Sequence, residues 1–344
     1  MFIPFGAVVV SASNQVVEVE SADYGGAHCC LSGCDAAQTW QRNDSNPCAV
    51  SLVVTERMEA PIFLYYKLTN YYQNHRRYVR SRSDPQLMGD TVTLEEIDQV
   101  SSCRYHVQHD AADPHSLISP CGLIAWSYFN DSFKVFKPGG AGEVALRETG
   151  IAWSTDVASK FKNSPNGSTG AFFPNFAHER MQTCADLPSA AQRTECLASP
   201  ATPAAGWCYP GSGYCVEDEH FMVWMRAAGL PSFRKLYAVI EEDLMPGTYT
   251  VQVSNGVLVN GAYRNAWEGY EVQRFLYPVS SFGGTKSIVL STKSWIGGRN
   301  FFIGYAYVIV GVVCIVLALC FLIKHKLSPR ELGDATYIAH AKAS

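Results

Sequence analysis

An uncharged apolar run near the C-terminus constrains this chain more than any other feature. Residues 301–323 (FFIGYAYVIVGVVCIVLALCFLI) contain no Asp, Glu, Lys or Arg. At about 1.5 Å per residue a helix of this length spans about 35 Å, whereas the apolar core of a bilayer is about 30 Å thick. Buried helices of soluble domains rarely lack polar residues for so long. We therefore predict a transmembrane helix over residues 299–323.

Basic residues directly after this run indicate how the chain is oriented in the membrane. Lys324, His325, Lys326 and Arg330 follow the run. Because positive charge is enriched on the cytoplasmic side of a membrane helix, we predict that residues 324–344 form a cytoplasmic tail. The ectodomain, residues 13–298, then lies on the lumenal or extracellular side.

Cysteines and sequons agree with an ectodomain in an oxidising compartment. Ten of the twelve cysteines precede the apolar run, and only Cys314 and Cys320 lie within it. An even number predicts a disulfide framework, which outweighs a zinc site at Cys29, Cys30 and Cys34. The expected disulfide cysteines are Cys29, Cys30, Cys34, Cys48, Cys103, Cys121, Cys184, Cys196, Cys208 and Cys215. The sequons predict glycosylation at Asn43, Asn130 and Asn166.

The first ten residues, MFIPFGAVVV, are apolar and fit two interpretations. The run is too short to span a bilayer and has no basic residue before it. It is either a weak signal peptide that ends near residues 10–12, or the C-terminal end of a first transmembrane helix over residues 1–12.

Short apolar segments separated by turns predict a mainly β ectodomain. Strand candidates lie at residues 60–68, 117–136, 247–254 and 286–292. Their length and spacing favour an antiparallel, β-sandwich-like fold with short helices and disulfides.

One segment of the ectodomain is predicted to be helical. Pro231 suits a first helical position, and residues 232–244 (SFRKLYAVIEEDL) follow it. Their apolar side chains at helical spacing are Phe233, Leu236, Tyr237 and Ile240. Pro246 and Gly247 then end the helix with a turn.

Residues 174–215 differ from the rest of the ectodomain. They are rich in Ala, Pro and Ser and hold Cys184, Cys196, Cys208 and Cys215. Without a long apolar run they have little burial to offset their ordering entropy. Two disulfides at about 2–4 kcal/mol each would compensate, so we predict a cysteine-rich insertion with its own bridges.

A stretch of arginines and tyrosines, residues 65–84 (YYKLTNYYQNHRRYVRSRSD), has the composition of a nucleic-acid-binding surface. The formal net charge of −4 and the predicted side of the membrane argue against nucleic acid as a partner. Two interpretations remain open. The arginines pair with carboxylates inside the ectodomain, or they contact a partner outside it, either a protein with acidic loops or the headgroups of membrane phospholipids. Arg76 and Arg77 are the candidate contacts with a protein partner.

The sequence lacks the motifs that usually carry catalysis. It has no GxSxG, HExxH, P-loop or CxxC, and its nine histidines are scattered. We therefore expect neither a catalytic site nor a cofactor.

Several blocks of sequence together resemble one family. The blocks are YYKLTNYYQNHRRYVRSRSDPQLMGD, CGLIAWSYFND, GIAWSTDVASKF, FMVWMRAAGLPSFRKLY and SWIGGRNFFIGYAYVIVG. They are similar, in the same order, to signature blocks of the cell-division-control-protein-50 family, also called the ligand effect modulator family. They cover most of residues 60–320.

The resemblance implies a non-catalytic β-subunit of type-IV P-type ATPases, the lipid flippases. Such subunits have two transmembrane helices and a glycosylated, disulfide-bonded, β-rich ectodomain. Each forms a heterodimer with an ATPase α-subunit, accompanies it out of the endoplasmic reticulum, and is needed for phospholipid transfer to the cytoplasmic leaflet. Residence in the endoplasmic reticulum, the Golgi, endosomes or the plasma membrane would follow. The alternative is an orphan glycosylated receptor or adhesion protein of the same topology.

The resemblance also reaches individual residues. Cys103 and Cys121 match a family disulfide, and Asn130 matches a family glycosylation site. Residues 1–12 resemble the exit of the family's first helix, which favours the transmembrane interpretation of this segment. The cysteines that correspond to two further family bridges, with their pairing open, are Cys29, Cys30, Cys34 and Cys48.

A stripe of small residues is a further candidate contact within the membrane. Gly304, Gly311 and Ala318 are spaced by seven and therefore line one face of the predicted helix. Such a stripe suits close packing against the first helix or against a helix of the ATPase. Glycine is also common in membrane helices without this role.

The last candidates lie in the blocks beside the membrane helix. Trp295 can sit at headgroup level, either to orient the ectodomain or simply as a linker anchor, and Asn300 suits a helix N-cap. Arg234 and Lys235 either form buried ion pairs or face acidic lumenal loops of the ATPase.

Overall fold

A computed structural model of the chain describes residues 1–25, 48–90, 92–93, 95–97, 103, 120–129, 131–163, 213, 215–255, 279, 282–295 and 297–328. These residues belong to two compact units. One unit comprises Met1–Val17 and Lys293–Ser344, and the other comprises Glu18–Thr292.

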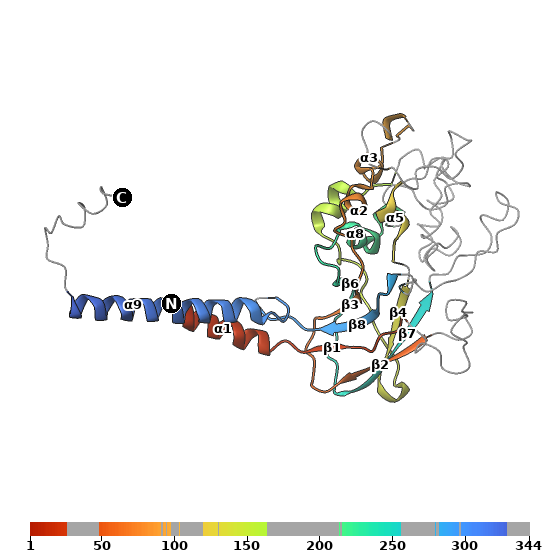
Figure 1. The fold of residues 1–344 in the computed structure, drawn as a ribbon. Coiled ribbons are helices and arrows are strands. Elements are labelled where there is room, and N and C mark those ends of the chain that lie inside the picture. The colour runs from red at the N-terminus through yellow and green to blue at the C-terminus, as the bar shows by residue number, and fades with distance from the viewer. Residues whose placement is uncertain are drawn as a thin grey trace, which may run out of the picture. The chain divides into compact units, whose positions relative to one another are not determined.

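Two antiparallel sheets form the framework of the unit Glu18–Thr292 (Figure 1). The strand order of the first sheet is β1 (Glu18–Glu20), β8 (Lys286–Ser291), β3 (Ile62–Leu68) and β6 (Phe233–Ile240). The order of the second is β2 (Cys48–Val54), β7 (Gly247–Asn255), β4 (Asp131–Phe136) and β5 (Glu143–Val144). The prediction of antiparallel sheets with short helices is confirmed.

The two sheets contact each other through buried side chains. Phe133 of β4 meets Tyr237 of β6 edge-on, with ring centroids 4.7 Å apart. The Lys286 ammonium of β8 lies 2.6 Å from a carboxylate oxygen of Asp131 in β4, and both side chains are almost completely buried. Desolvation lowers the pKa of Lys286, although Asp131 opposes it. The sequence analysis missed this ion pair, since nothing along the chain links residues so far apart.

Three of the four strand candidates are confirmed. β3 and β8 lie within the ranges 60–68 and 286–292, and β7 covers the range 247–254 and extends one residue beyond it. Among the described residues of the range 117–136, only Asp131–Phe136 is a strand, whereas Leu123–Trp126 forms the short helix α5. Gly122, with φ +105°, precedes this helix in a conformation that favours glycine.

The predicted helix over residues 232–244 is wrong, because Phe233–Ile240 is strand β6. It pairs with β3 in the register Leu68↔Phe233 to Ile62↔Ile240. Residues 237–240 are all buried, which is the pattern of a strand covered on both faces. Tertiary pairing therefore overrides an apolar spacing that also fits a helix turn.

The helices of this unit are short, and α2, α3, α5 and α8 lie at the same end of the sheets in Figure 1. Their bounds are α2 Arg76–Arg80, α3 Asp84–Leu87, α8 Glu219–Met225, η2 Pro138–Gly140, η3 Asp156–Lys160 and η5 Cys215–Glu217. Asp218 begins α8 as an N-cap, because its carboxylate accepts the His220 N–H at 2.9 Å.

The other unit contains two helices, α1 (Phe2–Asn14) and α9 (Phe301–Leu327). Among the described residues, α9 is the one helix long and apolar enough to cross a membrane. The Asn300 side chain accepts the Phe302 N–H at 3.0 Å and caps α9 as expected. The Ser13 hydroxyl donates to the Asn300 carbonyl at 2.9 Å, which joins the end of α1 to the start of α9.

Two glycines of α9 pack against α1. A Cβ atom on Gly304 would lie 2.6 Å from Val10, and one on Gly311 would lie 2.6 Å from Ile3. Such distances exclude any larger residue without a shift of the helices. Ala318 lies farther along α9 in an exposed stretch. Of the partners considered for the stripe, α1 is therefore the one that the two glycines contact.

Candidate partner-binding surface

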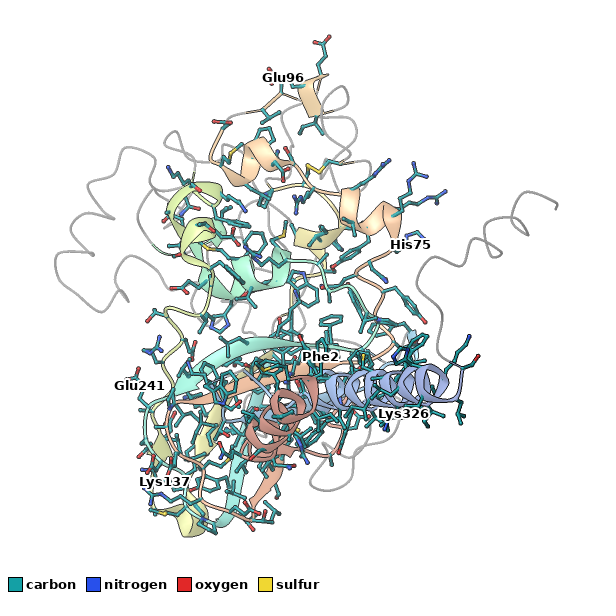
Figure 2. All side chains as sticks on the ribbon, turned by 90° about the vertical axis from the view of Figure 1, so that its left-hand side faces the viewer. Phe2, His75, Glu96, Lys137, Glu241 and Lys326 are labelled. Atoms are coloured by element: carbon teal, nitrogen blue, oxygen red, sulfur yellow. A yellow bond between two sulfur atoms is a disulfide. The ribbon has the colours of Figure 1, made fainter. Side chains whose placement is uncertain are left out.

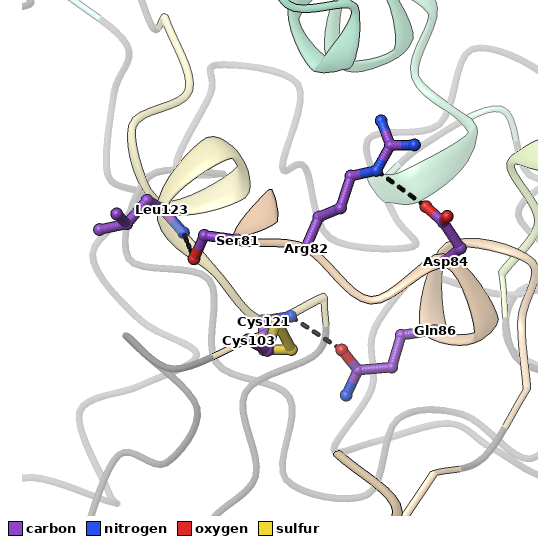
Figure 3. Close-up of a disulfide and its surroundings, with 7 residues drawn as sticks. All are labelled: Ser81, Arg82, Asp84, Gln86, Cys103, Cys121 and Leu123. Carbon is purple, nitrogen blue, oxygen red and sulfur yellow. Dashed lines mark hydrogen bonds and ion pairs between the residues drawn. A yellow bond between two sulfur atoms is a disulfide. The ribbon is translucent and has the colours of Figure 1, made fainter. Parts of the chain in front are cut away.

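The arginines of residues 65–84 do not behave alike. Arg76, Arg77 and Arg80 lie on α2, are exposed, and make no ion pair with the described residues. Arg82 does pair, with its Nε 2.9 Å from Asp84 (Figure 3). Internal pairing thus accounts for Arg82 alone, and three guanidinium groups remain for a partner.

His75 positions these arginines, and Figure 2 shows it at the surface of the ectodomain. It is the N-cap of α2, where its Nδ1 accepts the Arg77 N–H at 3.3 Å. A five-residue helix has too few internal hydrogen bonds to be stable by itself, so contacts with the rest of the ectodomain must hold it.

The tyrosines of the stretch supply part of that support. Tyr66 stacks on Phe129 with ring centroids 3.9 Å apart. The Tyr78 hydroxyl lies 2.8 Å from that of Ser127, and burial is the main reason that its pKa is well above the usual value. Tyr71 packs edge-on against Phe282 at 5.2 Å. These three rings face inward, so the segment presents its cations outward and these three rings, unlike the exposed Tyr72, to the core.

The loop between α8 and β6 is hydrogen-bonded to residues 71–74, which directly precede His75 and α2. The Gln73 side chain accepts the Ala228 N–H at 2.9 Å, and the Asn74 amide donates to the Gly229 carbonyl at 2.9 Å. The Tyr71 N–H also donates to a carbonyl of this loop, that of Pro231. The arginines of α2 and residues 226–231 therefore form one connected surface.

The Cys103–Cys121 disulfide supports the C-terminal part of the segment, residues 81–86 (Figure 3). Cys103 and Cys121 are bonded, and the Cys121 N–H donates to the Gln86 side chain at 2.8 Å. The Leu123 N–H donates to Ser81 Oγ at 3.0 Å. One hydrogen bond from within α3 and one from just before it thus attach the segment to the residues at and after Cys121.

The cations of β6 are not exposed for contact in the same way. Lys235 is only 7% exposed, and its ammonium donates to the carbonyls of Val223 (2.9 Å), Trp224 (2.9 Å) and Arg226 (2.5 Å). It thereby caps the C-terminal end of α8. Burial, and secondarily Arg226, lower its pKa to about 7. The expectation that Lys235 faces a partner is corrected, because the core of the ectodomain encloses it.

Arg234 on the outer face of β6 is already engaged. Its guanidinium lies 2.7 Å from Glu18 and 5.0 Å from the centre of the Tyr65 ring. It therefore forms an ion pair within the ectodomain, although this pair is exposed and not buried as the first of the two roles supposed.

The other predicted site residues are Trp295, the cysteines and the glycosylation sites. Trp295 is exposed at 69% and belongs to the unit that contains α9. Cys48 and Cys215 are disulfide-bonded, and Cys314 and Cys320 of α9 are free. The expected sites that lie outside the described residues are Asn43, Asn130, Asn166, Cys29, Cys30, Cys34, Cys184, Cys196 and Cys208.

A cleft of about 800 Å³ beside α8 contains several acidic side chains. Glu217 accepts the N–H groups of Asn163 and Gly213, and Glu219 accepts three consecutive N–H groups of residues 150–152. The carboxylates of Glu217 and Glu219 thus bind backbone N–H groups and stabilise the neighbouring loops. Within the described residues no cluster of three His, Cys, Asp or Glu side chains could hold a metal ion.

The sequence analysis also missed Trp153, which it treated only as part of a signature block. This side chain is 65% exposed, and the guanidinium of Arg226 lies 4.7 Å from the centre of its ring. A tryptophan in an apolar stretch is usually assigned to the core, so no sequence signal distinguishes it.

Comparison with known proteins places the chain in a family. The model of the LEM3 (ligand-effect modulator 3) / CDC50 family matches residues 9–331. "ALA-interacting subunit 3" of Arabidopsis thaliana is 36% identical over 342 residues, which cover 98% of this chain and 81% of the relative. "Cell cycle control protein 50B" of Homo sapiens is 37% identical over 342 residues, which cover 94% of this chain and 83% of the relative. The chain therefore belongs to the LEM3/CDC50 family.

Proposed function

We propose that this chain is the non-catalytic accessory subunit of a type-IV P-type ATPase, in which it forms a heterodimer with the phospholipid-translocating α-subunit. Family membership supports this role, and the name of the Arabidopsis relative describes a subunit that interacts with ALA. Accordingly, the chain assists the folding of the ATPase, its exit from the endoplasmic reticulum and its transfer of phospholipid to the cytoplasmic leaflet.

The observation that carries the proposal is the cationic surface on α2. Arg76, Arg77 and Arg80 are exposed and make no ion pair with the described residues, although hydrogen bonds hold their segment on both flanks. A fixed group of unpaired charges suits recognition of another protein, because the geometry is prepared before binding. The acidic lumenal loops of an ATPase are the complementary surface.

The proposed topology places α9 across the bilayer, the ectodomain in the lumen or outside the cell, and residues 324–344 in the cytoplasm. Glycans on Asn43, Asn130 and Asn166 belong to the same proposal. Sensitivity of the intact chain to glycosidase, and protection of the ectodomain from protease in sealed microsomes, would test the orientation.

Purification of the tagged full chain in mild detergent tests the partner. A type-IV P-type ATPase is expected to co-purify in near-stoichiometric amount, and depletion of the chain should reduce cellular uptake of a fluorescent phospholipid. The proposal is wrong if the purified chain carries no such ATPase and its depletion leaves lipid uptake unchanged. Recovery of an extracellular ligand instead would favour the receptor alternative.

A further inference from the structure

Trp153 is an apolar side chain that is exposed to solvent and positioned by contacts with neighbouring residues. It is 65% exposed on the segment between β5 and η3. Leaving an indole ring in water forgoes a large hydrophobic gain. Exposed tryptophans therefore call for an explanation when the structure fixes their position.

The backbone before Trp153 is fixed by the start of α8. Both carboxylate oxygens of Glu219 are used: one accepts the Gly150 N–H at 2.8 Å, and the other accepts those of Ile151 at 2.7 Å and Ala152 at 2.8 Å. Gly150 has φ +72°, a conformation that a larger residue rarely adopts. Three charge-assisted hydrogen bonds to consecutive residues hold this turn in a single conformation.

The indole ring itself is fixed by the end of α8. The Arg226 guanidinium lies 4.7 Å from the ring centre, and its Nε donates to Asp156 at 2.6 Å. Asp156 is almost completely buried and also pairs with Lys160 at 3.0 Å. The Arg226 carbonyl in turn accepts a hydrogen bond from Lys235. Arg226, which contacts the ring, is thus itself fixed by Asp156, and Asp156 is fixed in turn by Lys160.

Arg226 has binding capacity left after these contacts. Its two terminal nitrogens make no hydrogen bond with the described residues, and its side chain is 45% exposed. A guanidinium group whose two terminal nitrogens are available can donate two parallel N–H bonds to the oxygens of one carboxylate in a planar arrangement. An apolar ring beside such an edge fits a ligand that combines an apolar side chain with an acidic one.

The Trp153–Arg226 pair continues into the cationic surface of α2. The loop after Arg226 contains Leu230, which is 69% exposed, and it holds Gln73 and Asn74 by hydrogen bonds. Tyr72, 57% exposed, lies beside these residues in the chain. Exposed aromatic and arginine side chains surrounded by further cations have the composition of a binding hot spot.

We propose that Trp153, oriented by Arg226, is the apolar anchor of the surface that binds the ATPase, and that its ligand is an acidic segment carrying an apolar side chain. This inference rests on the proposed function. The guanidinium edge of Arg226 binds the carboxylate of that segment, the indole packs on its apolar group, and the α2 arginines attract its remaining negative charge.

Co-purification of the full chain with the ATPase, at matched expression, tests the anchor. Trp153→Ala should reduce the recovered ATPase about tenfold or more, while Trp153→Phe retains most of it. The control is Met245→Ala, which removes another exposed apolar side chain (56%) between β6 and β7, at the opposite end of β6 from residues 226–231, and should have no effect. Thermal unfolding of the purified full chain verifies that the variants are folded.

Two substitutions of opposite charge at position 153 test whether the ligand is acidic. Trp153→Glu should lower recovery further than Trp153→Lys, because the first repels an acidic segment and the second attracts it. Equal recovery with wild type and Trp153→Ala would overturn the inference while leaving the proposed function intact. If Trp153→Ala is unfolded, the Glu and Lys variants decide: equal loss from both, in folded protein, also overturns it. Failure of wild type to recover the ATPase would instead refute the proposed function.

Discussion

Two segments of similar composition use their cations in opposite ways. NHRRYV around α2 and FRKLY in β6 both combine arginine or lysine with tyrosine. On α2, Arg76, Arg77 and Arg80 face outward without an ion pair among the described residues. In β6, Lys235 is enclosed by three carbonyl groups, and Arg234 is paired with Glu18. Composition therefore indicates neither burial nor availability to a partner.

The largest effect is expected from Lys235→Met. Loss of the Lys235 ammonium leaves three carbonyls at the end of α8, one of them buried, without their donor. This costs about 3–5 kcal/mol in the free energy of unfolding. Chemical denaturation of the purified full chain measures the change. Lys134→Met on the exposed side of β4 is the matched control and should stay within about 0.5 kcal/mol of wild type. Equal stability of the two variants would show that Lys235 is not a structural residue.

A smaller loss is expected when the disulfide behind α2 is removed. Cys103 and Cys121 are 18 residues apart, and closure of a loop of that length stabilises a fold by about 3 kcal/mol. The double variant Cys103→Ser, Cys121→Ser should unfold at a lower temperature and recover less ATPase, because the Cys121 N–H helps to hold the segment through Gln86. Unchanged recovery would mean that this flank does not support the binding surface.

The pH dependence of stability should report on Lys235. Since its pKa is about 7 in the folded chain and 10.5 is the ordinary value, the unfolded chain binds more protons between these limits. Stability therefore rises with pH through this window, by on the order of 1 kcal/mol per pH unit, and this contribution is flat below pH 7. Denaturation midpoints at several pH values measure the slope. Lys235→Met should remove it, and a slope that persists in this variant would assign it to another group.

Arg76→Ala combined with Arg77→Ala should spare folding and weaken binding. Neither side chain has an ion pair within the described residues, so the free energy of unfolding should change by less than about 0.5 kcal/mol. ATPase recovery should fall about tenfold and depend less on salt, because exposed charges are screened by ions. The control Arg57→Ala with Lys134→Ala removes the same charge elsewhere, together with the exposed Arg57–Asp243 ion pair, which as a surface contact contributes little to stability. Endoplasmic-reticulum retention through misfolding of the arginine variant would instead favour a structural role.

The smallest effect concerns Arg82, the arginine of the stretch that does pair. Its contact with Asp84 lies at the surface, where such pairs contribute about 0–1 kcal/mol. Arg82→Ala should leave both the unfolding midpoint and ATPase recovery nearly unchanged. A large loss of recovery would extend the binding surface beyond α2.

Sequence reasoning succeeded where the signal is local. The apolar run predicted α9, and short apolar segments predicted β3 and β8. It failed at Phe233–Ile240, where four apolar side chains fit both a helix and a buried strand. Pairing with β3, more than 160 residues away in the chain, decides between them.

The candidate site shows the same limit more strongly. The arginines were found from the sequence, but their two possible roles could not be separated, and Trp153 was read only as part of a block. Its exposure depends on Glu219 and Arg226 at the two ends of α8, both more than 60 residues farther along the chain. Such contacts have no pattern in a linear sequence.

By itself, the sequence determined the long apolar helix α9, the mainly β character of the unit Glu18–Thr292 and the family, because these depend on local hydropathy, on short apolar segments and on long, distinctive blocks of sequence. Only the tertiary structure decided which cations are available. Burial is a property of the surroundings, so Lys235 became a cap for α8 while Arg76 and Arg77 stayed in solvent. The same long-range contacts hold an indole at the surface, where its chemistry can serve a partner.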